Sequence, residues 1–367
     1  MAKLFSSTLF FTIILATIFS LTVVHFLQYL DLNKRVYNHV PGECSTIQSI
    51  QSGAPDMVFF ENNIFFPSGS DINNSTNATE AGIYIYRPES RELLKIELSS
   101  FNEKKQFNPH GLSIFMNVVF VTNSLYPEKS HDRVDIFNFV FKKNKFEPPK
   151  LKFQKSITSE VMTGIRGITA VGKNRFYLTN KYYFRKPGLR KFEVIMKLNT
   201  GTIMYFDGKK IQIAATNLPT PTGMAYDGRK RQLYVTCFSV NSVFVYNANL
   251  ASLTKVNEIQ LNSAPYFLSF DPLNQNLLIA AHPLKIRYLF YESYPYDYFS
   301  PSQILEIQRK KSKNGKSKWS IKELYVNDGA TISAATSVLM TFPKDRPRQL
   351  LIGNMHSGIL ACDVTYV

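Results

Sequence analysis

The stretch HGLSIFMNVVFVTN (110–123) has an alternating run, a polar turn and a second apolar run, the pattern of two antiparallel strands. Three later segments repeat this pattern. They begin with RGITAV at 166, TGMAYD at 222 and YFLSFD at 266, which places successive repeats 56, 56 and 44 residues apart. A period of about 40–50 residues built from several short strands is typical of a β-propeller. Residues 44–367 have room for about five or six such blades.

The rest of the chain after residue 43 also consists of short strand-like runs, separated by turn residues such as DG, NG and KPG. Helical periodicity is almost absent there, so the sequence predicts an all-β domain. In a propeller the first strand of each blade borders the central channel, and the residues that open the four repeats should converge near the axis. These residues are His110, Arg166, Thr222 and Tyr266.

The N-terminal segment has a different composition. No Lys, Arg, Asp or Glu occurs from Leu4 to Leu30, and residues 9–30 would form a helix about 33 Å long, enough for a hydrocarbon layer of about 30 Å. We expect a transmembrane signal anchor, because a cleaved signal peptide, the alternative, usually has a shorter apolar stretch and a small-residue exit. The expected division is a cytoplasmic tail (1–8), the anchor (9–30), a linker (31–43) and the propeller (44–367).

Three glycosylation sequons, at Asn73, Asn74 and Asn77, predict the compartment of the propeller. Unless they are a chance cluster in a polar loop, they place it in the secretory lumen or outside the cell, on the endoplasmic reticulum or plasma membrane. The net charge of +16 therefore does not indicate nucleic-acid binding. The basic runs at 181–191 and 309–318 are expected to be solvated loop faces. The alternative is contact with an acidic partner or anionic lipid headgroups.

The three cysteines predict at most one disulfide. Cys44 lies near the start of the predicted propeller and Cys362 near its end, so a bond between them would join the two ends of the domain. Cys237 lies in the apolar run LYVTCFSV and is expected to be a buried, reduced thiol.

The four axial positions are poorly suited to a metal ion. Ca²⁺ takes six to eight oxygen ligands, several of them carboxylates. The axial positions instead supply an imidazole, a permanent guanidinium cation, a hydroxyl and a phenol. The nearby carboxylate candidate is Asp56, and the sequence therefore argues against a calcium site and predicts no cofactor.

From about Cys44 to the C-terminus the chain resembles the paraoxonase/arylesterase family. The segments that carry the resemblance are IQSGAPDMVFF, SSFNEKKQFNPHGLSIF, GITAVGKNRFYLTNKYYF, LSFDPLNQNLLIAAHP and QLLIGNMHSGILACDV. The resemblance implies a six-bladed β-propeller preceded by one apolar N-terminal helix, a disulfide between Cys44 and Cys362, and a calcium-dependent lactonase or esterase activity.

The family's site residues match this chain only in part. Its calcium-ligand positions carry Pro55, Arg166-Gly167, Thr222-Gly223 and Tyr266-Phe267, while Asp56 retains an aspartate that binds a structural calcium ion in the family. The first channel histidine of the family matches His110, and the second falls on Ser124, with His131 displaced by several residues. His282 at a predicted strand end is expected to be structural.

These substitutions lead to one interpretation for His110 and one prediction for Arg166. His110 is interpreted as a hydrogen-bonded relic of the family's histidine, because a general base needs reach and a tuned pKa. Arg166 is predicted to take over the electrostatic role of calcium in a salt bridge with Asp56, and the alternative is two solvated side chains that never meet.

Three function classes stay open. The first is a membrane-anchored pseudoenzyme that assists folding, assembly or surface delivery of a degenerin/epithelial-type ion channel, which is what resemblance to nematode members of the family implies. The second is a calcium-dependent arylesterase or lactonase, and the third is a lipid-binding scaffold that uses the basic loops.

Overall fold

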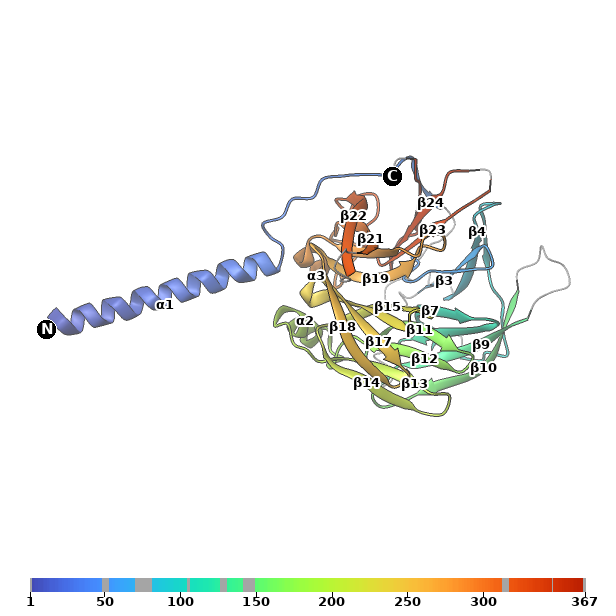
Figure 1. Ribbon diagram of the computed structural model, residues 1–367, viewed down its shortest axis with the longest axis horizontal. Coiled ribbons are helices and arrows are strands. Elements are labelled where there is room, and N and C mark those ends of the chain that lie inside the picture. The colour runs from blue at the N-terminus through green and yellow to red at the C-terminus, as the bar shows by residue number, and fades with distance from the viewer. Residues whose placement is uncertain are drawn as a thin grey trace.

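Each repeated strand pair of the sequence forms the inner half of a sheet in the computed structural model of the chain (Figure 1). The structure describes residues 2–47, 53–69, 81–103, 106–125, 131–140, 149–311, 317–344 and 346–365. The three sequon asparagines lie outside these residues. Six sheets radiate from a common axis and confirm the six-bladed β-propeller.

Five blades are continuous in sequence. The first contains β2 (Val58–Phe60), β3 (Asn63–Ser68), β4 (Gly82–Arg87) and β5 (Glu92–Lys95). The second contains β6 (Leu98–Ser99), β7 (Pro109–Phe115), β8 (Val118–Asn123), β9 (Arg133–Val140) and β10 (Lys150–Thr158). The third contains β11 (Ile165–Gly172), β12 (Arg175–Asn180), β13 (Gly201–Phe206) and β14 (Ile211–Leu218). The fourth contains β15 (Pro221–Asp227), β16 (Gln232–Cys237), β17 (Ser242–Asn249) and β18 (Ser252–Gln260). The fifth contains β19 (Ala264–Phe270), β20 (Leu277–His282), β21 (Ser302–Lys311) and β22 (Ser317–Asn327).

The sixth blade closes the ring with strands from both ends of the domain. It contains β23 (Ser337–Thr341), β24 (Gln349–Gly353), β25 (Ile359–Asp363) and, on its outer edge, β1 (Cys44–Ile47). Cys44 and Cys362 are register partners on β1 and β25, and they form the predicted disulfide. The covalent link therefore joins the first strand of the propeller to the last. Cys237 is a buried free thiol, as predicted.

The repeated glycine and threonine residues hold neighbouring blades together. Thr179 on β12 accepts a hydrogen bond from the Gly167 amide (2.8 Å) and donates one to the carbonyl of Thr222 in the next blade (2.5 Å). Thr122 and Thr236 make equivalent bonds in the adjoining blades. A Cβ atom on Gly167 would lie 2.5 Å from the Thr222 carbonyl oxygen, so this close approach requires glycine.

The N-terminal helix α1 (Ala2–Tyr29) projects away from the propeller in Figure 1. Its segment Leu9–Tyr29 is apolar, exposed and long enough to cross a membrane. The end of α1 is tied to the propeller: the Tyr29 hydroxyl donates to the carbonyl of Val194, and Lys285 Nζ donates to the carbonyl of Tyr29 (3.1 Å). The tail, anchor and linker boundaries stay predictions, although β1 does begin at Cys44.

Two short helices cover one end of the channel. The sequence pattern did not predict them. They are α2 (Pro187–Ile195), which begins with a proline, and α3 (Lys285–Tyr291). Because α2 occupies residues 187–191 of the basic run 181–191, the prediction of a loop is wrong for that part of the run. Proline at the first turn of a helix removes an amide that would have no partner anyway, so it favours a helix start.

Candidate ligand-binding site in the central channel

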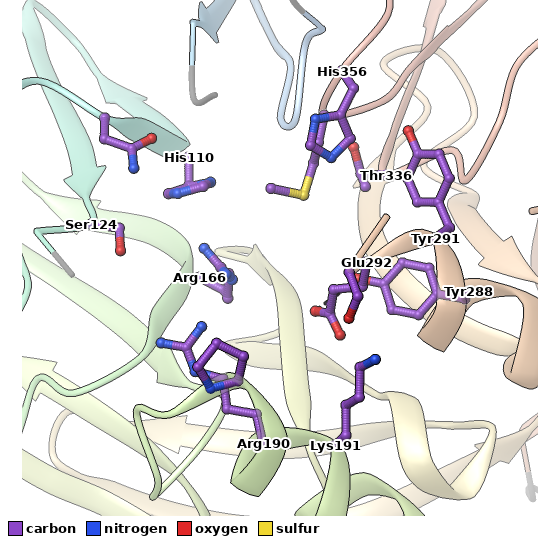
Figure 2. A pocket seen from close by; sticks show the side chains of 14 residues that line it. His110, Ser124, Arg166, Arg190, Lys191, Tyr288, Tyr291, Glu292, Thr336 and His356 are labelled. Carbon is purple, nitrogen blue, oxygen red and sulfur yellow. Dashed lines mark hydrogen bonds between the residues drawn. The ribbon is translucent and has the colours of Figure 1, made fainter. Parts of the chain in front are cut away.

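A cavity of about 250 Å³ lies at the end of the channel covered by α2 and α3 (Figure 2). Its lining comes from four of the blades and from both helices. The lining residues are Asn108, His110, Ser124, Arg166, Pro187, Arg190, Lys191, Tyr288, Tyr291, Glu292, Ser293, Thr336, Met355 and His356. In Figure 2 Arg166 lies between His110 and Arg190, and Arg190 and Lys191 approach from α2.

Irregular strand pairing positions the axial residues. The register between β7 and β8 shifts between Pro109 and Leu112, and the register between β11 and β12 shifts between Ile165 and Ile168. A bulge leaves an extra residue unpaired and re-aims its side chain. The two shifts thus fall at His110 and Arg166, which both line the cavity. Equivalent shifts fall at Thr222 and Tyr266, so the shift marks all four axial positions and does not alone decide which side chains enter the cavity.

The other two axial residues, Thr222 and Tyr266, are buried in contacts within and between the blades. Thr222 is completely buried and bonds to the Thr236 hydroxyl (2.8 Å) and to the carbonyl of Tyr266. Tyr266 is 1% exposed and makes an edge contact with His282, 5.4 Å between ring centroids. The expected convergence therefore supplies only two of the four side chains to the cavity lining.

Asp56 does not pair with Arg166, and the predicted salt bridge is wrong within the described residues. Its two carboxylate oxygens accept hydrogen bonds from the amides of Met57 (2.8 Å) and Leu112 (2.9 Å). Asp56 thus ties the start of the first blade to β7. Burial raises the pKa of Asp56 to about 7, although the two amides act in the opposite direction.

A buried ion pair beside the cavity was not foreseen from the sequence. Lys181 is 1% exposed, and its Nζ lies 3.3 Å from Oε1 of Glu292. The same oxygen accepts hydrogen bonds from the hydroxyls of Tyr182 (3.2 Å) and Tyr288 (3.3 Å). Nζ also lies 4.6 Å from the ring centre of Tyr182 and 4.8 Å from that of Tyr266, so aromatic faces surround the ammonium group.

The pKa shifts of this pair are consistent with two charged partners. Burial opposes ionisation of Glu292, but Lys181, Arg166 and Arg190 outweigh it and lower the pKa of the carboxyl. Burial likewise opposes the charge on Lys181, but Glu292 and the neighbouring tyrosines raise its pKa overall. The cue in the sequence was the lysine of TNKYYF, which follows a buried strand directly.

His110 lies in a strongly positive environment. It is 6% exposed, and its Nδ1 has no hydrogen-bond partner in the described part of the chain, contrary to the expectation of a bonded relic. Burial lowers the pKa of His110 well below its usual range, and Arg166, His356 and Arg190 lower it further. The imidazole is therefore neutral at pH 7, and protonating it during a reaction would be unfavourable.

Of the other positions considered with the histidines, Ser124 lines the cavity and His131 and His282 do not. Ser124 lines the cavity, and its hydroxyl donates to Asp132 (3.4 Å), whereas His131 is not among the lining residues described above. His282 is completely buried and stacks on Tyr288, with 4.2 Å between ring centres, in agreement with a structural role.

These residues do not fit the calcium ion that the family resemblance implies. No group of three or more His, Cys, Asp or Glu side chains within the described ranges is arranged to hold a metal. The Arg166 guanidinium lines the cavity, the Thr222 hydroxyl is bonded within the blade packing, and both oxygens of Asp56 bind amides. At about 5 Å and an effective dielectric constant near 20, Arg166 would repel a divalent cation by several kcal/mol.

The cavity is instead able to bind anions and polar acceptors. Arginine and lysine side chains supply donors from two sides, and the aromatic side chains of Tyr288 and Tyr291 form part of the wall.

Comparison with known proteins identifies relatives over nearly the whole chain. A profile of the family described as Arylesterase matches residues 16–364. Mechanosensory abnormality protein 6 of Caenorhabditis elegans is 30% identical over 96% of this chain and 95% of its own length. Serum paraoxonase/arylesterase 1 of Rattus norvegicus is 26% identical over 88% of each chain.

A solved structure supports the architecture alone. A luciferin-regenerating enzyme covers 88% of this chain and 95% of its own length, with a TM-score of 0.53 and 11% sequence identity. At that identity the similarity concerns the fold.

Proposed function

Since the chain belongs to the paraoxonase/arylesterase family, we propose that it is a membrane-anchored member without calcium-dependent hydrolase activity. Its role is to assist the folding, assembly or surface delivery of a degenerin/epithelial-type ion channel. The observation that carries the proposal is the Arg166 guanidinium in the channel, at a position where the family has a calcium ligand. Similarity to Mechanosensory abnormality protein 6 supports the choice of a sensory-channel context.

The mechanism is surface binding to a channel subunit during its assembly. The apolar segment Leu9–Tyr29 anchors the protein, and contacts from Tyr29 to α2 and α3 hold the propeller beside the membrane. Confinement of two partners to one membrane raises their effective concentration, so a modest intrinsic affinity is sufficient.

The second candidate function is a calcium-dependent arylesterase or lactonase. The family match over residues 16–364 and the presence of His110 in the cavity favour it. The missing metal ligands oppose it, because polarisation of the substrate carbonyl by a metal is a large part of such catalysis.

Purified full-length protein in detergent micelles separates the two functions. We expect no turnover of aryl esters or lactones above background, with calcium or with a chelator, and recovery of a co-expressed degenerin/epithelial-type subunit with the tagged protein. The complex should persist in His110→Ala. Calcium-dependent turnover that disappears in His110→Ala would establish the hydrolase instead.

A further inference from the structure

The channel cavity carries more positive charge than its own acidic side chains balance. Its lining includes three permanent or nearly permanent cations, Arg166, Arg190 and Lys191. Glu292 is the one carboxylate among the lining residues that the structure describes. The cavity as a whole is therefore cationic.

Glu292 stabilises Arg166 and Arg190 electrostatically, but it is one negative charge shared among several cations. Its Oε1 atom is already shared by Lys181 Nζ and by the hydroxyls of Tyr182 and Tyr288. Because Lys181 is a further cation on the same carboxylate, the charges of Glu292 and of the lining cations still sum to a positive value.

Arg166 is the side chain that most needs a partner. Its Nε is buried without a hydrogen-bond partner, and its guanidinium has no ion-pair partner among the described residues. Arg166 is half-buried, and an anion beside its guanidinium would add a charge-assisted hydrogen bond that the protein does not supply. The lowered pKa of His110, caused first by burial and then by Arg166 and its cationic neighbours, reports the same positive potential.

We propose that this cavity binds a small organic carboxylate, with its carboxylate group held by Arg166 and attracted by Arg190 and Lys191. A planar guanidinium matches a carboxylate in two parallel hydrogen bonds. The walls at Tyr288 and Tyr291 supply apolar faces for the body of the ligand.

The size of the cavity agrees with this class of ligand. A cavity of about 150 Å³ is sufficient to hold benzene, and this one, at about 250 Å³, leaves additional room for a carboxylate group. An inorganic anion would satisfy the cations but would leave the aromatic wall without a contact. The binding does not depend on the proposed channel role, since all the groups involved belong to this chain.

Isothermal titration calorimetry on the full chain in detergent micelles tests the proposal. The probes are phenylacetate, its neutral analogue phenylacetamide, inorganic phosphate and calcium chloride. Phenylacetate should bind saturably with one site per chain and should bind at least tenfold more tightly than phenylacetamide or phosphate. Equal affinity for phenylacetate and phenylacetamide, or tight binding of calcium with no binding of phenylacetate, would overturn the proposal.

Variants locate the site. Arg166→Gln should weaken phenylacetate binding by roughly 10- to 100-fold, the value of a lost charge-assisted hydrogen-bonded pair. Arg175→Gln removes an exposed arginine from the same blade and should leave the affinity unchanged. If Arg166→Gln does not fold, Lys191→Gln on α2 provides the second test, with a smaller loss expected. Unchanged affinity in the folded variants would place binding elsewhere and refute the assignment.

Discussion

Replacing Thr179 by valine tests how the repeated threonines join the blades. Valine has nearly the shape of threonine but removes the hydroxyl that accepts from the Gly167 amide and donates to the Thr222 carbonyl. Both backbone groups lie in a fully buried contact between two blades. Leaving a buried polar group unpaired costs about 1–3 kcal/mol, so the two together should cost about 2–6 kcal/mol.

This loss is large compared with the usual stability of a folded domain, about 5–15 kcal/mol. Urea unfolding of the full chain in detergent micelles measures it through the fluorescence of Trp319, the single tryptophan. With a denaturant dependence of about 3 kcal/mol per molar, a loss of 3 kcal/mol lowers the midpoint by about 1 M urea.

Two matched variants isolate the hydroxyl. Thr179→Ser keeps both hydrogen bonds and should lose much less stability than Thr179→Val. Thr169→Val makes the same replacement at a half-buried position on β11 and should shift the midpoint little. A Thr179→Val midpoint equal to that of the wild type, or a similar loss in Thr169→Val, would refute this account of blade contact.

Three further predictions concern the closure, the buried histidine and the metal. The double variant Cys44→Ser/Cys362→Ser removes a disulfide that closes a loop of 318 residues. Its free energy of unfolding should fall by about 5–6 kcal/mol on a chain-entropy estimate, and an unchanged urea midpoint would contradict this. Burial, with Lys181 close by, lowers the pKa of His282 from 6.5 to about 3. The unfolded chain therefore binds more protons between those values, and stability that is complete above pH 6.5 falls as the pH drops. The loss from pH 6.5 to 5 should be about 2 kcal/mol and should vanish in His282→Phe; an identical pH slope in both proteins would show that His282 is not responsible. An excess of EDTA should leave the thermal midpoint unchanged, and a clear drop, reversed by calcium, would reveal a bound structural metal.

Several features could be read from the sequence because they depend on local patterns. The alternation in HGLSIF and its three repeats predicts strands, since side chains on a strand point to opposite faces in turn. The length and composition of residues 9–30 predict the apolar helix, and the positions of Cys44 and Cys362 near the two ends of the domain agree with the disulfide.

The composition of the cavity depended on which side chains the tertiary structure turns toward the axis. The sequence repeat predicted an axial position for Arg166, because the register shift in β11 falls where the repeated segment begins. Its expected partner was not found, because Asp56 bonds to nearby amides instead. The pair between Lys181 and Glu292 joins residues 111 positions apart, and no periodicity connects them.

The sequence by itself determined the β-propeller and the apolar helix, since each follows from residue type and spacing along the chain. Only the tertiary structure decided that the cationic residues of β11 and α2 share one cavity whose single described carboxylate is already paired. The physical reason is that charge balance depends on distances between groups from different blades, and these distances are set only when the ring of sheets has closed.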